Sequence, residues 1–344
     1  MSSRGATLGV SLALAIGLGV GGSQLTVPYV GLGPGPVFNT LGTSGGAPLI
    51  QVPKDRDHPA GGELDLTTVN VYPRLTLGQA IGKWFDRRFA VVPRDVVYPP
   101  DQSEQESEQE TQREMTESQE HAVTAALCEL GTPILARVVI DAVGDGTPAA
   151  AAGVKVGDVV TTIDGGRVDS VCALRRLVAR HQPGDTIRLG YRRGGTDGVA
   201  SIVTRAGETG GSDGRPVMGV GLKEQEPRPP FPVTIALNDV GGPSAGLMFA
   251  LGIYDRLTPG DLTGGKVIAG TGSIDDDGAV GPIGGIQQKL VAARAHGAAY
   301  FLTPSGNWDD AVKATPKGLH LVRVSTLREA LAAVRAIARG ATPR

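Results

Sequence analysis

Apolar residues along this chain follow two periods, and the change from one to the other marks the predicted elements. Residues 62–71 alternate apolar and polar side chains, which predicts a strand. Apolar residues recur at helical spacing over residues 77–85, with Thr76 in place to cap that helix. A short β-branched run at residues 233–237 precedes another helical pattern over residues 247–254. This mixture of strand and helix patterns predicts an α+β fold.

The middle of the chain predicts a compact β-rich module over residues 131–208. Short strand patterns are interspersed with two helix patterns and end at turns that contain glycine. The strand candidates are residues 134–140, residues 156–163 and two strands around residues 192–198, and the helix candidates are residues 147–153 and 169–181.

An acidic segment precedes this module. Residues 101–120 contain eight carboxylates and one arginine, and such a charge run is typical of a solvated segment. We therefore expect an acidic loop at residues 101–115. Thr116 and Gln119 form a capping-box pattern, which predicts that a helix starts near Thr116.

The N-terminal part of the chain carries almost no charge. No Asp, Glu, Lys or Arg occurs from Gly5 to Pro53, and residues 6–22 are mostly Leu, Ala, Val, Ile and Gly. This pattern predicts a signal-anchor or single transmembrane segment over residues 1–30, with the remainder on the extracytoplasmic side of the cell membrane. A buried glycine-rich segment of a soluble domain is the alternative, and the sequence leaves open whether the segment is cleaved.

The composition and motifs of the chain argue against nucleic-acid, nucleotide and metal binding. A net charge of −2 over 344 residues gives no footprint for nucleic acid. No nucleotide is expected, because Val267 follows Gly264-Gly-Lys266 where a phosphate-binding loop needs Ser or Thr. No metal and no cofactor are expected, since zinc-type Cys/His spacing is absent and Asp275–Gly278 fits a hairpin turn better than a calcium loop. Cys128 and Cys172 fall in predicted helices, and they could pair in an exported protein.

The most informative motif is a serine between small residues, Ser244. The preceding strand and turn place this serine at a predicted helix N-terminus, where free N–H groups and the helix dipole stabilise an oxyanion. Gly242, Pro243 and Ala245 belong to the same candidate site because glycine and small residues let a substrate carbonyl approach the backbone. A glycine-rich turn whose serine caps the helix is the alternative.

Lys289 follows Ser244 by 45 residues, on a helix predicted from Gly285 to His296 with Gly297 as its stop. It lies at the edge of an apolar stripe, where small neighbours would desolvate the amine and lower its pKa toward neutrality. Such an amine can take the proton of a serine hydroxyl, so the two residues predict a Ser-Lys dyad. A lysine that extends into water is the alternative.

The serine motif also satisfies G-x-S-x-G, the nucleophile elbow of α/β-hydrolases. That fold needs an acid and a histidine downstream, which residues 275–277 and either His296 or His320 could supply. This interpretation leaves Lys289 unexplained, and only 100 residues follow the serine. We therefore favour the Ser-Lys dyad.

Several runs in the last third of the chain resemble the proteolytic domain of Lon-type proteases. The runs are Gly242-Pro-Ser-Ala-Gly-Leu247, Leu262-Thr-Gly-Gly-Lys-Val-Ile-Ala-Gly-Thr-Gly-Ser-Ile274, Gly278-Ala-Val-Gly-Pro-Ile-Gly-Gly-Ile-Gln-Gln-Lys289, Ala292-Ala-Arg-Ala-His-Gly297 and Pro304-Ser-Gly-Asn307. The resemblance implies that Ser244 is the nucleophile, that Lys289 is the base and that Thr271 hydrogen-bonds near the lysine. It also implies a homo-oligomeric ring, a hexamer.

The β-rich module resembles a bacterial PDZ domain, most specifically over Pro148–Val160. PDZ domains add an extended peptide to a sheet edge and hold its C-terminal carboxylate on backbone N–H groups. By this resemblance the peptide-binding loop would lie at Gly131, Thr132, Pro133 and Ile134, which depart from the usual Gly-Leu-Gly-Phe form. A spacer or a lid that regulates access to the serine is the alternative.

The two resemblances divide the chain into four predicted parts. Residues 1–30 form the membrane segment, residues 31–130 the first part of a Lon-type domain, residues 131–208 the PDZ-like domain, and residues 209–344 the proteolytic core. The strand at residues 62–71 and the helix that follows it resemble the start of a Lon-type domain. This implies that the PDZ-like domain is inserted into the protease domain.

The predicted function is that of a membrane-anchored serine endopeptidase that works without ATP on polypeptide substrates that are already accessible. The alternative is a membrane-tethered PDZ adaptor that binds peptides and carries a latent or inactive protease fold.

Overall fold

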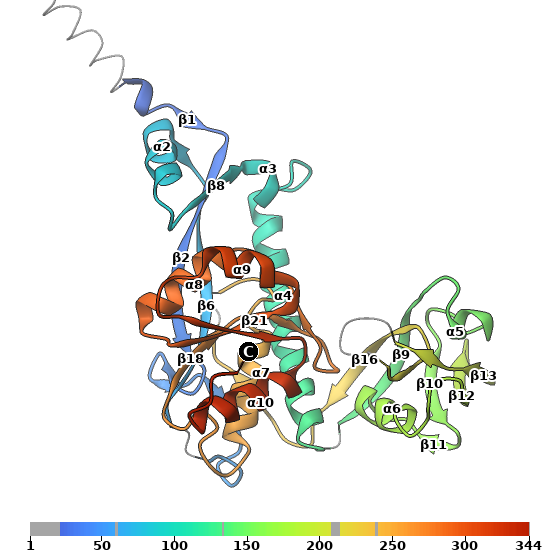
Figure 1. The fold of residues 1–344 in the computed structure, drawn as a ribbon. Helices are drawn as coiled ribbons and strands as arrows, with labels where there is room; N and C mark the ends of the chain where they lie inside the picture. The colour runs from blue at the N-terminus through green and yellow to red at the C-terminus, as the bar shows by residue number, and fades with distance from the viewer. Residues whose placement is uncertain (1–20, 59–60, 133, 208–213, 238–239, 344) are drawn as a thin grey trace, which may run out of the picture.

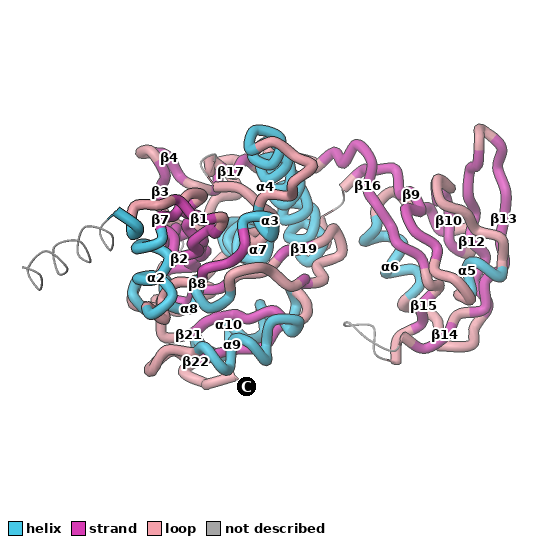
Figure 2. Tube along the Cα trace, turned by 90° about the horizontal axis from the view of Figure 1, so that it is seen from above, coloured by secondary structure: helices cyan, strands magenta, loops and turns pink. Residues whose placement is uncertain are grey.

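The computed structural model describes residues 21–343 except residues 59–60, 133, 208–213 and 238–239. Most of the predicted membrane segment, residues 1–20, therefore lies outside the described residues. In the part that is described, no helix is both long enough and apolar enough to cross a membrane. The described chain forms two lobes, a larger one with a mixed sheet and a smaller β-rich one (Figures 1 and 2).

A six-stranded sheet forms the centre of the larger lobe, in the order β22-β21-β18-β6-β2-β8. The strands are β2 (Tyr29–Asn39), β6 (Glu63–Tyr72), β8 (Ala90–Pro93), β18 (Val267–Gly270), β21 (Tyr300–Pro304) and β22 (His320–Val324). The strand predicted at residues 62–71 is confirmed as β6. It pairs in parallel with β18, so segments that come before and after the β-rich lobe in the sequence meet in one sheet.

Helices cover both faces of this sheet. On one face lie α4 (Glu104–Glu129), α7 (Gly246–Arg256) and α10 (Leu327–Ala338), and on the other lie α8 (Ile286–His296) and α9 (Trp308–Ala314). Ile268 and Leu302 belong to the first apolar cluster, whereas their neighbours Ala269 and Phe301 belong to the second. This alternation is expected for strands that are buried on both sides.

The acidic loop predicted at residues 101–115 is wrong, because α4 begins at Glu104 and continues to Glu129. Ser103 caps it in a capping box with Glu106, which satisfies the first free N–H groups of the helix. Thr116, expected near the helix start, lies inside the helix and donates to the carbonyl of Gln112. The acidic residues form the exposed side of the helix, while Met115 and later small residues are buried.

The helix predicted at residues 77–85 is confirmed as α2 (Leu77–Phe85), with Thr76 as its N-cap. Its assignment to the start of a Lon-type domain stays a prediction. Ala80 is its buried residue, and most of its large apolar side chains are exposed. The helix that packs on α7 is α4, which has Ser118 hydrogen-bonded to the carbonyl of Pro243 at 2.9 Å.

The β-rich lobe has the strand order β13-β12-β10-β9-β16, with β11 paired to β10. Its elements are β9 (Leu135–Val143), α5 (Pro148–Ala151), β10 (Val159–Ile163), β11 (Gly166–Arg167), α6 (Val171–Val178), β12 (Thr186–Arg193), β13 (Thr196–Val203) and β16 (Val220–Arg228). Residues 220–228 were assigned to the proteolytic core, and that assignment is wrong. Their strand pairs with β9 along most of its length and forms an edge of this sheet.

Short strands, one short helix and a turn complete the fold. They are β1 (Thr26–Val27), β3 (Thr43–Ser44), β4 (Ala47–Pro48), β5 (Ile50–Gln51), β7 (Leu75–Thr76), α3 (Arg94–Val97), β14 (Arg205–Ala206), β15 (Pro216–Val217), β17 (Thr234–Ile235), β19 (Ser273–Ile274), β20 (Val280–Gly281) and the 3₁₀ turn Ser305–Asn307. The hairpin turn predicted at residues 275–278 is confirmed, because β19 and β20 pair across it.

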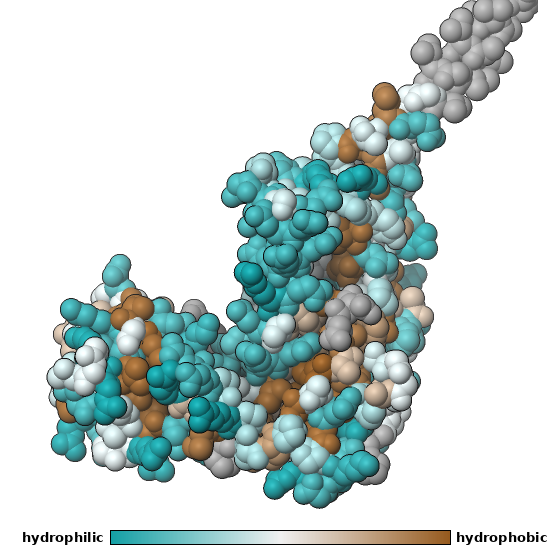
Figure 3. Space-filling model, turned by 180° about the vertical axis from the view of Figure 1, so that it is seen from behind, coloured by the Kyte–Doolittle hydropathy of each residue, from teal (hydrophilic) through white to brown (hydrophobic). Residues whose placement is uncertain are grey.

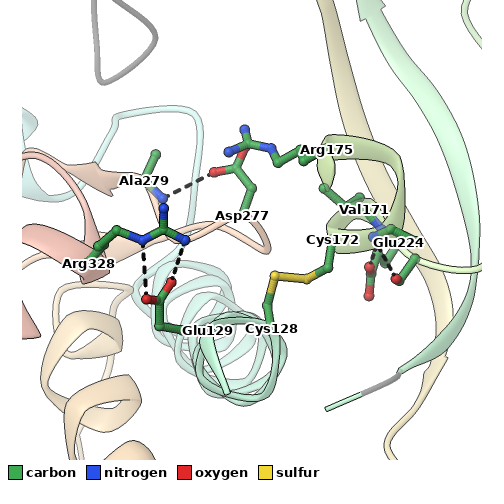
Figure 4. The surroundings of a disulfide bond; sticks show 11 residues. Cys128, Glu129, Val171, Cys172, Arg175, Glu224, Asp277, Ala279 and Arg328 are labelled. Atoms are coloured by element: carbon green, nitrogen blue, oxygen red, sulfur yellow. Dashed lines mark hydrogen bonds and ion pairs between the residues drawn. A yellow bond between two sulfur atoms is a disulfide. The ribbon is translucent and has the colours of Figure 1, made fainter. Parts of the chain in front are cut away.

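A disulfide joins the two lobes (Figure 4). Cys128 at the end of α4 is bonded to Cys172 on α6, with their Cα atoms 5.7 Å apart. Beside it, Arg175 of α6 forms an ion pair with Asp277 of the β19–β20 turn. The sequence left open whether the two cysteines pair, and in this structure they do.

Candidate active site

Ser244 lies in the turn that leads into α7, two residues before the helix begins at Gly246. Gly242 has φ of 84°, a left-handed conformation that favours glycine, and its N–H donates to the carbonyl of Thr111 on α4. A Cβ atom on Gly246 would come within 2.7 Å of Ile274 and 2.9 Å of the Ser118 hydroxyl. The glycines therefore let the turn pack tightly between α4 and the strand β19.

The side chain of Lys289 reaches Ser244 from α8, on the opposite face of the sheet. Its Nζ lies 2.8 Å from Ser244 Oγ, 3.1 Å from Thr271 Oγ1 and 2.9 Å from the carbonyl oxygen of Thr67. Three acceptors thus surround the amine and fix its direction. The structure brings together Ser244, Lys289 and Thr271, as the sequence predicted.

Because Lys289 is buried, its amine holds a proton less tightly than an exposed lysine does. Lys289 is 2% exposed, and burial lowers its pKa from the usual 10.5 to about 7. Hydroxyl and carbonyl oxygens surround the amine, and burial is the one cause of the shift. A large fraction of the amine is therefore neutral near pH 7 and can accept the serine proton.

Thr271 holds the serine turn as well as the lysine. Its hydroxyl donates to the carbonyl oxygen of Ser244 at 2.9 Å, and the N–H of Gly272 donates to the same oxygen at 2.9 Å. Among the described residues, no hydrogen bond uses the N–H of Ser244 or Ala245. These two N–H groups at the start of α7 are available to an oxyanion.

Thr67 is the contact that sequence reasoning missed. It lies on β6 and binds Lys289 through its backbone carbonyl, while its hydroxyl donates to the carbonyl of Gly270. A backbone contact leaves no residue-type pattern. Only the pairing of β6 with β18 could have placed it, and that pairing is between segments about 200 residues apart.

The predicted peptide-binding loop lies away from this site. Gly131 follows the C-terminal end of α4 with φ of 69°, and Ile134 is buried at 2% exposure. The N–H of Thr132 donates to the carbonyl of Leu127, which closes the helix end. Pro133 lies outside the described residues. The edge strands of the β-rich sheet are β13 and β16, and β16 starts beyond residue 208.

The histidines of the α/β-hydrolase interpretation take other positions. His320 stacks on Tyr300, with the ring centroids 5.6 Å apart. His296 lies at the far end of α8, 3.8 Å from Asp65. Among the described residues no histidine is hydrogen-bonded to Ser244, so the geometry favours lysine as its partner.

Glu63, Asp65 and His296 form a group whose ligand atoms lie within 4.8 Å of one another and could hold a metal ion. Asp65 is fully buried, no group among the described residues donates a hydrogen bond to its carboxylate, and burial raises its pKa to about 6. Its side chain comes from the strand that also carries Thr67, but it takes no part in the contacts of Lys289. The expectation of no metal stays a prediction.

Comparison with known proteins matches both parts of the chain. Residues 238–336 match the C-terminal proteolytic domain of Lon protease (S16), and residues 106–204 match a PDZ domain. The chain therefore contains a Lon-type proteolytic domain together with a PDZ domain. The PDZ match begins inside α4, which is earlier than the first strand of the β-rich sheet.

Two curated relatives and one solved structure illustrate these similarities. Lon protease 2 of Bacillus subtilis (strain 168) is 36% identical over 94 residues, 27% of this chain and 16% of that protein. Serine protease Do-like HtrA of Lactobacillus helveticus is 43% identical over 49 residues, 14% of this chain and 12% of that protein. The PDZ domain of the SdrC-like protein of Listeria monocytogenes is 29% identical, with 25% of this chain and 86% of that chain covered and a TM-score of 0.23. The chain thus spans less than a fifth of the curated relatives it matches.

Proposed function

We propose that this protein is a serine endopeptidase that hydrolyses polypeptides with a Ser244–Lys289 dyad and without ATP. One observation carries the proposal. The amine of a lysine that is 2% exposed lies 2.8 Å from the hydroxyl of a serine at a helix start, inside a Lon-type proteolytic domain. The absence of a complete phosphate-binding loop in the sequence is the reason for proposing a reaction without nucleotide.

In the proposed reaction, neutral Lys289 takes the proton of Ser244 as Oγ attacks the carbonyl carbon of the scissile peptide bond. The N–H groups of Ser244 and Ala245 stabilise the negative oxygen of the tetrahedral intermediate. Protonated Lys289 then gives its proton to the leaving amine, and the acyl group remains as an ester on Ser244. Water loses a proton to Lys289 as it attacks this ester, and the protonated amine then gives that proton to Ser244 Oγ, which releases the acid and the free serine. Thr271 keeps the amine directed at Oγ throughout.

The PDZ-like lobe is proposed to bind peptides or to gate access to the serine. One of its two edge strands, β16, lies beside α6, the arrangement in which PDZ domains add a peptide strand. One N–H of this strand, that of Glu224, already donates to Asp276 of the larger lobe at 3.3 Å. A peptide that pairs with this part of β16 must replace the contact, which favours a gating role.

We also propose that residues 1–30 anchor the chain in a membrane with the protease lobe on the extracytoplasmic side. The uncharged apolar N-terminus supports the anchor. The Cys128–Cys172 disulfide supports the location, because disulfides persist in oxidising compartments. The similarity to Lon-type domains leads us to propose a ring of six chains. Light scattering of the purified chain should then give a mass six times 35.3 kDa.

A membrane-tethered PDZ adaptor with an inactive protease fold is the competing function. The full chain, incubated with an unstructured polypeptide, separates the two when compared with Ser244→Ala and Lys289→Met. The endopeptidase proposal requires cleavage by the parent and by Lys313→Met, a control at an exposed lysine, and none by the two dyad variants. Equal cleavage by all chains would eliminate the dyad. No cleavage by the assembled parent would favour the adaptor.

A further inference from the structure

Exposed apolar side chains are concentrated at one end of the larger lobe. Among the described residues, nine of fourteen exposed large hydrophobic side chains lie between residues 25 and 96. Four of them, Leu77, Ile81, Trp84 and Phe85, follow one another at helical spacing on α2 and are 39%, 51%, 69% and 82% exposed. We call these four residues the α2 stripe. A soluble surface helix normally turns such a stripe toward the core, so this one lacks its usual partner.

The protease core does not need this stripe. The helix packed on α7 is α4, which contributes Met115, Ala122, Ala125 and Ala126 to the main apolar cluster, and no residue of α2 belongs to that cluster. α2 stands with β1 and β8 at the end of the molecule, well apart from the helices of the catalytic site (Figure 1). The exposure of the stripe therefore has no explanation inside the described fold.

The start of α2 is tied to the end of the apolar N-terminal sequence. β1 pairs with β7, and the N–H of Leu77 donates to the carbonyl oxygen of Leu25 at 2.8 Å. Residues 5–22, which are uncharged and mostly apolar, thus end within a few residues of the contact that holds the helix. In the space-filling view, hydrophobic side chains are visible close to the point where the described chain begins (Figure 3). Any bilayer entered by the N-terminal sequence must lie next to α2.

The charges near the α2 stripe are those expected of a helix at a membrane surface. The segment from Tyr72 to Val96 contains five basic and two acidic residues, although the whole chain has a net charge of −2. Lys83 lies over the rings of Tyr72 and Phe89, 3.7 Å from each centroid. Tryptophan, phenylalanine and aliphatic side chains on one face, with lysine and arginine beside them, are typical of helices that lie in the membrane interface.

We infer that the α2 stripe inserts into the headgroup region of the lipid bilayer that holds the N-terminal segment, so that α2 lies along the membrane surface as a second attachment. This inference rests on the proposed membrane anchor. It also orients the molecule, because the PDZ-like lobe lies at the opposite end from α2 in both views (Figures 1 and 2). The lobe that binds or gates peptides would then face away from the membrane.

The test uses the two tryptophans of the chain, Trp84 and Trp308. Full-length protein is reconstituted into vesicles of phosphatidylcholine and phosphatidylglycerol, with or without bromine on the acyl chains. In the Trp308→Phe variant the remaining Trp84 should emit at shorter wavelength and lose roughly half of its fluorescence to brominated lipid. In the Trp84→Phe variant the remaining Trp308, which is half-buried in α9, should change little. Ile81→Asp with Phe85→Asp should abolish the quenching of Trp84.

Flotation of the same vesicles distinguishes failure of the proposed membrane anchor from failure of the inference about the α2 stripe. If the protein floats with the vesicles while Trp84 stays unquenched, the anchor stands and the inference fails. If the protein does not float at all, the anchor and the inference fail together. A blue shift of Trp84 that depends on protein concentration and not on bromine would mean that a second copy of the chain covers the stripe, which also overturns the inference.

Discussion

The dyad and the junction between the lobes both bury ionisable groups, but they surround them differently. Lys289 is buried among hydroxyl and carbonyl oxygens, no carboxylate of the described residues pairs with it, and its pKa falls to about 7. At the junction, Glu224 is 6% exposed and its pKa rises to about 7, first because of burial and also because Asp276 lies near it. The hydrogen bond that His121 donates to the carboxylate of Asp276 raises the pKa of His121 in the same place.

The comparison shows how burial without a counter-charge and burial inside a charged network serve different purposes. A lone amine that is half neutral near pH 7 can work as a base. A network of carboxylates, a histidine and Arg175 lies where the two lobes meet. The pKa values of its carboxylates and its histidine depend on how the lobes are packed. The predictions below alter one region at a time, from the largest expected effect to the smallest.

Lys289→Met should remove the base and leave the fold intact. We expect cleavage of an unstructured polypeptide to fall by a factor on the order of 10⁴ or more, as for other members of catalytic dyads and triads. Methionine has no buried amine to desolvate, so the substitution should also raise the free energy of unfolding by ~1–3 kcal/mol near pH 7. Rate measurement and urea unfolding test both, with the exposed Lys313→Met as control. A variant that is both inactive and strongly destabilised would contradict the account.

Cys172→Ser tests the covalent part of the junction. The disulfide closes a loop with a sequence separation of 44 residues, for which chain entropy gives about 4 kcal/mol of stabilisation. The free energy of unfolding of the β-rich lobe should fall by that order in thermal unfolding. Reduction of the parent with dithiothreitol should give the same loss, and the variant should not respond to it. If neither change lowers stability, the junction is not held by this bond.

Thr271→Val should weaken the dyad without removing it. Its hydroxyl holds Lys289 and the Ser244 carbonyl, and an unmade buried hydrogen bond costs about 1–3 kcal/mol, which is roughly a 5- to 150-fold loss of kcat/KM. Thr271→Ser keeps the hydroxyl and should recover most of the activity. Because Thr271 positions the base, the pH at which the activity of Thr271→Val is half-maximal should shift from about 7. Equal losses in both variants would indicate a packing role.

Glu224→Gln should remove a pH dependence from the junction. The pKa of Glu224 is raised above its unfolded value of 4.5 to about 7, so its stabilising contribution is present below pH 4.5 and is lost as pH rises through 7. Lys289 acts in the opposite direction, because its lowered pKa makes stability rise between about pH 7 and 10.5. Hydrogen exchange at β16 should become faster between pH 5 and 8 in the parent and less so in the variant. An identical pH dependence in both chains would contradict the role of Glu224.

The sequence predicted the side chains that meet at the candidate site better than the elements that support them. The proximity of Ser244 and Lys289 could be predicted because small residues, a turn and a helical stripe each leave a pattern. The first half of α4 was predicted as a loop because its charge run is typical of a solvated segment, although Ser103 and Glu106 form a capping box there. β16 was assigned to the wrong lobe because strand pairing between residues about 80 apart leaves no local pattern. Thr67 could not be found, since it acts through its backbone.

The most direct test of the central claim is the identity of the acylated residue. A short peptide ester is mixed with the full chain, quenched with acid within milliseconds and analysed by intact mass and peptide mapping. The account predicts one acyl group on the peptide that contains Ser244, no acyl group on Ser244→Ala, and slower acylation of Lys289→Met. An acyl group on another residue, or turnover of the ester by Ser244→Ala at the parent rate, would contradict the Ser244–Lys289 mechanism.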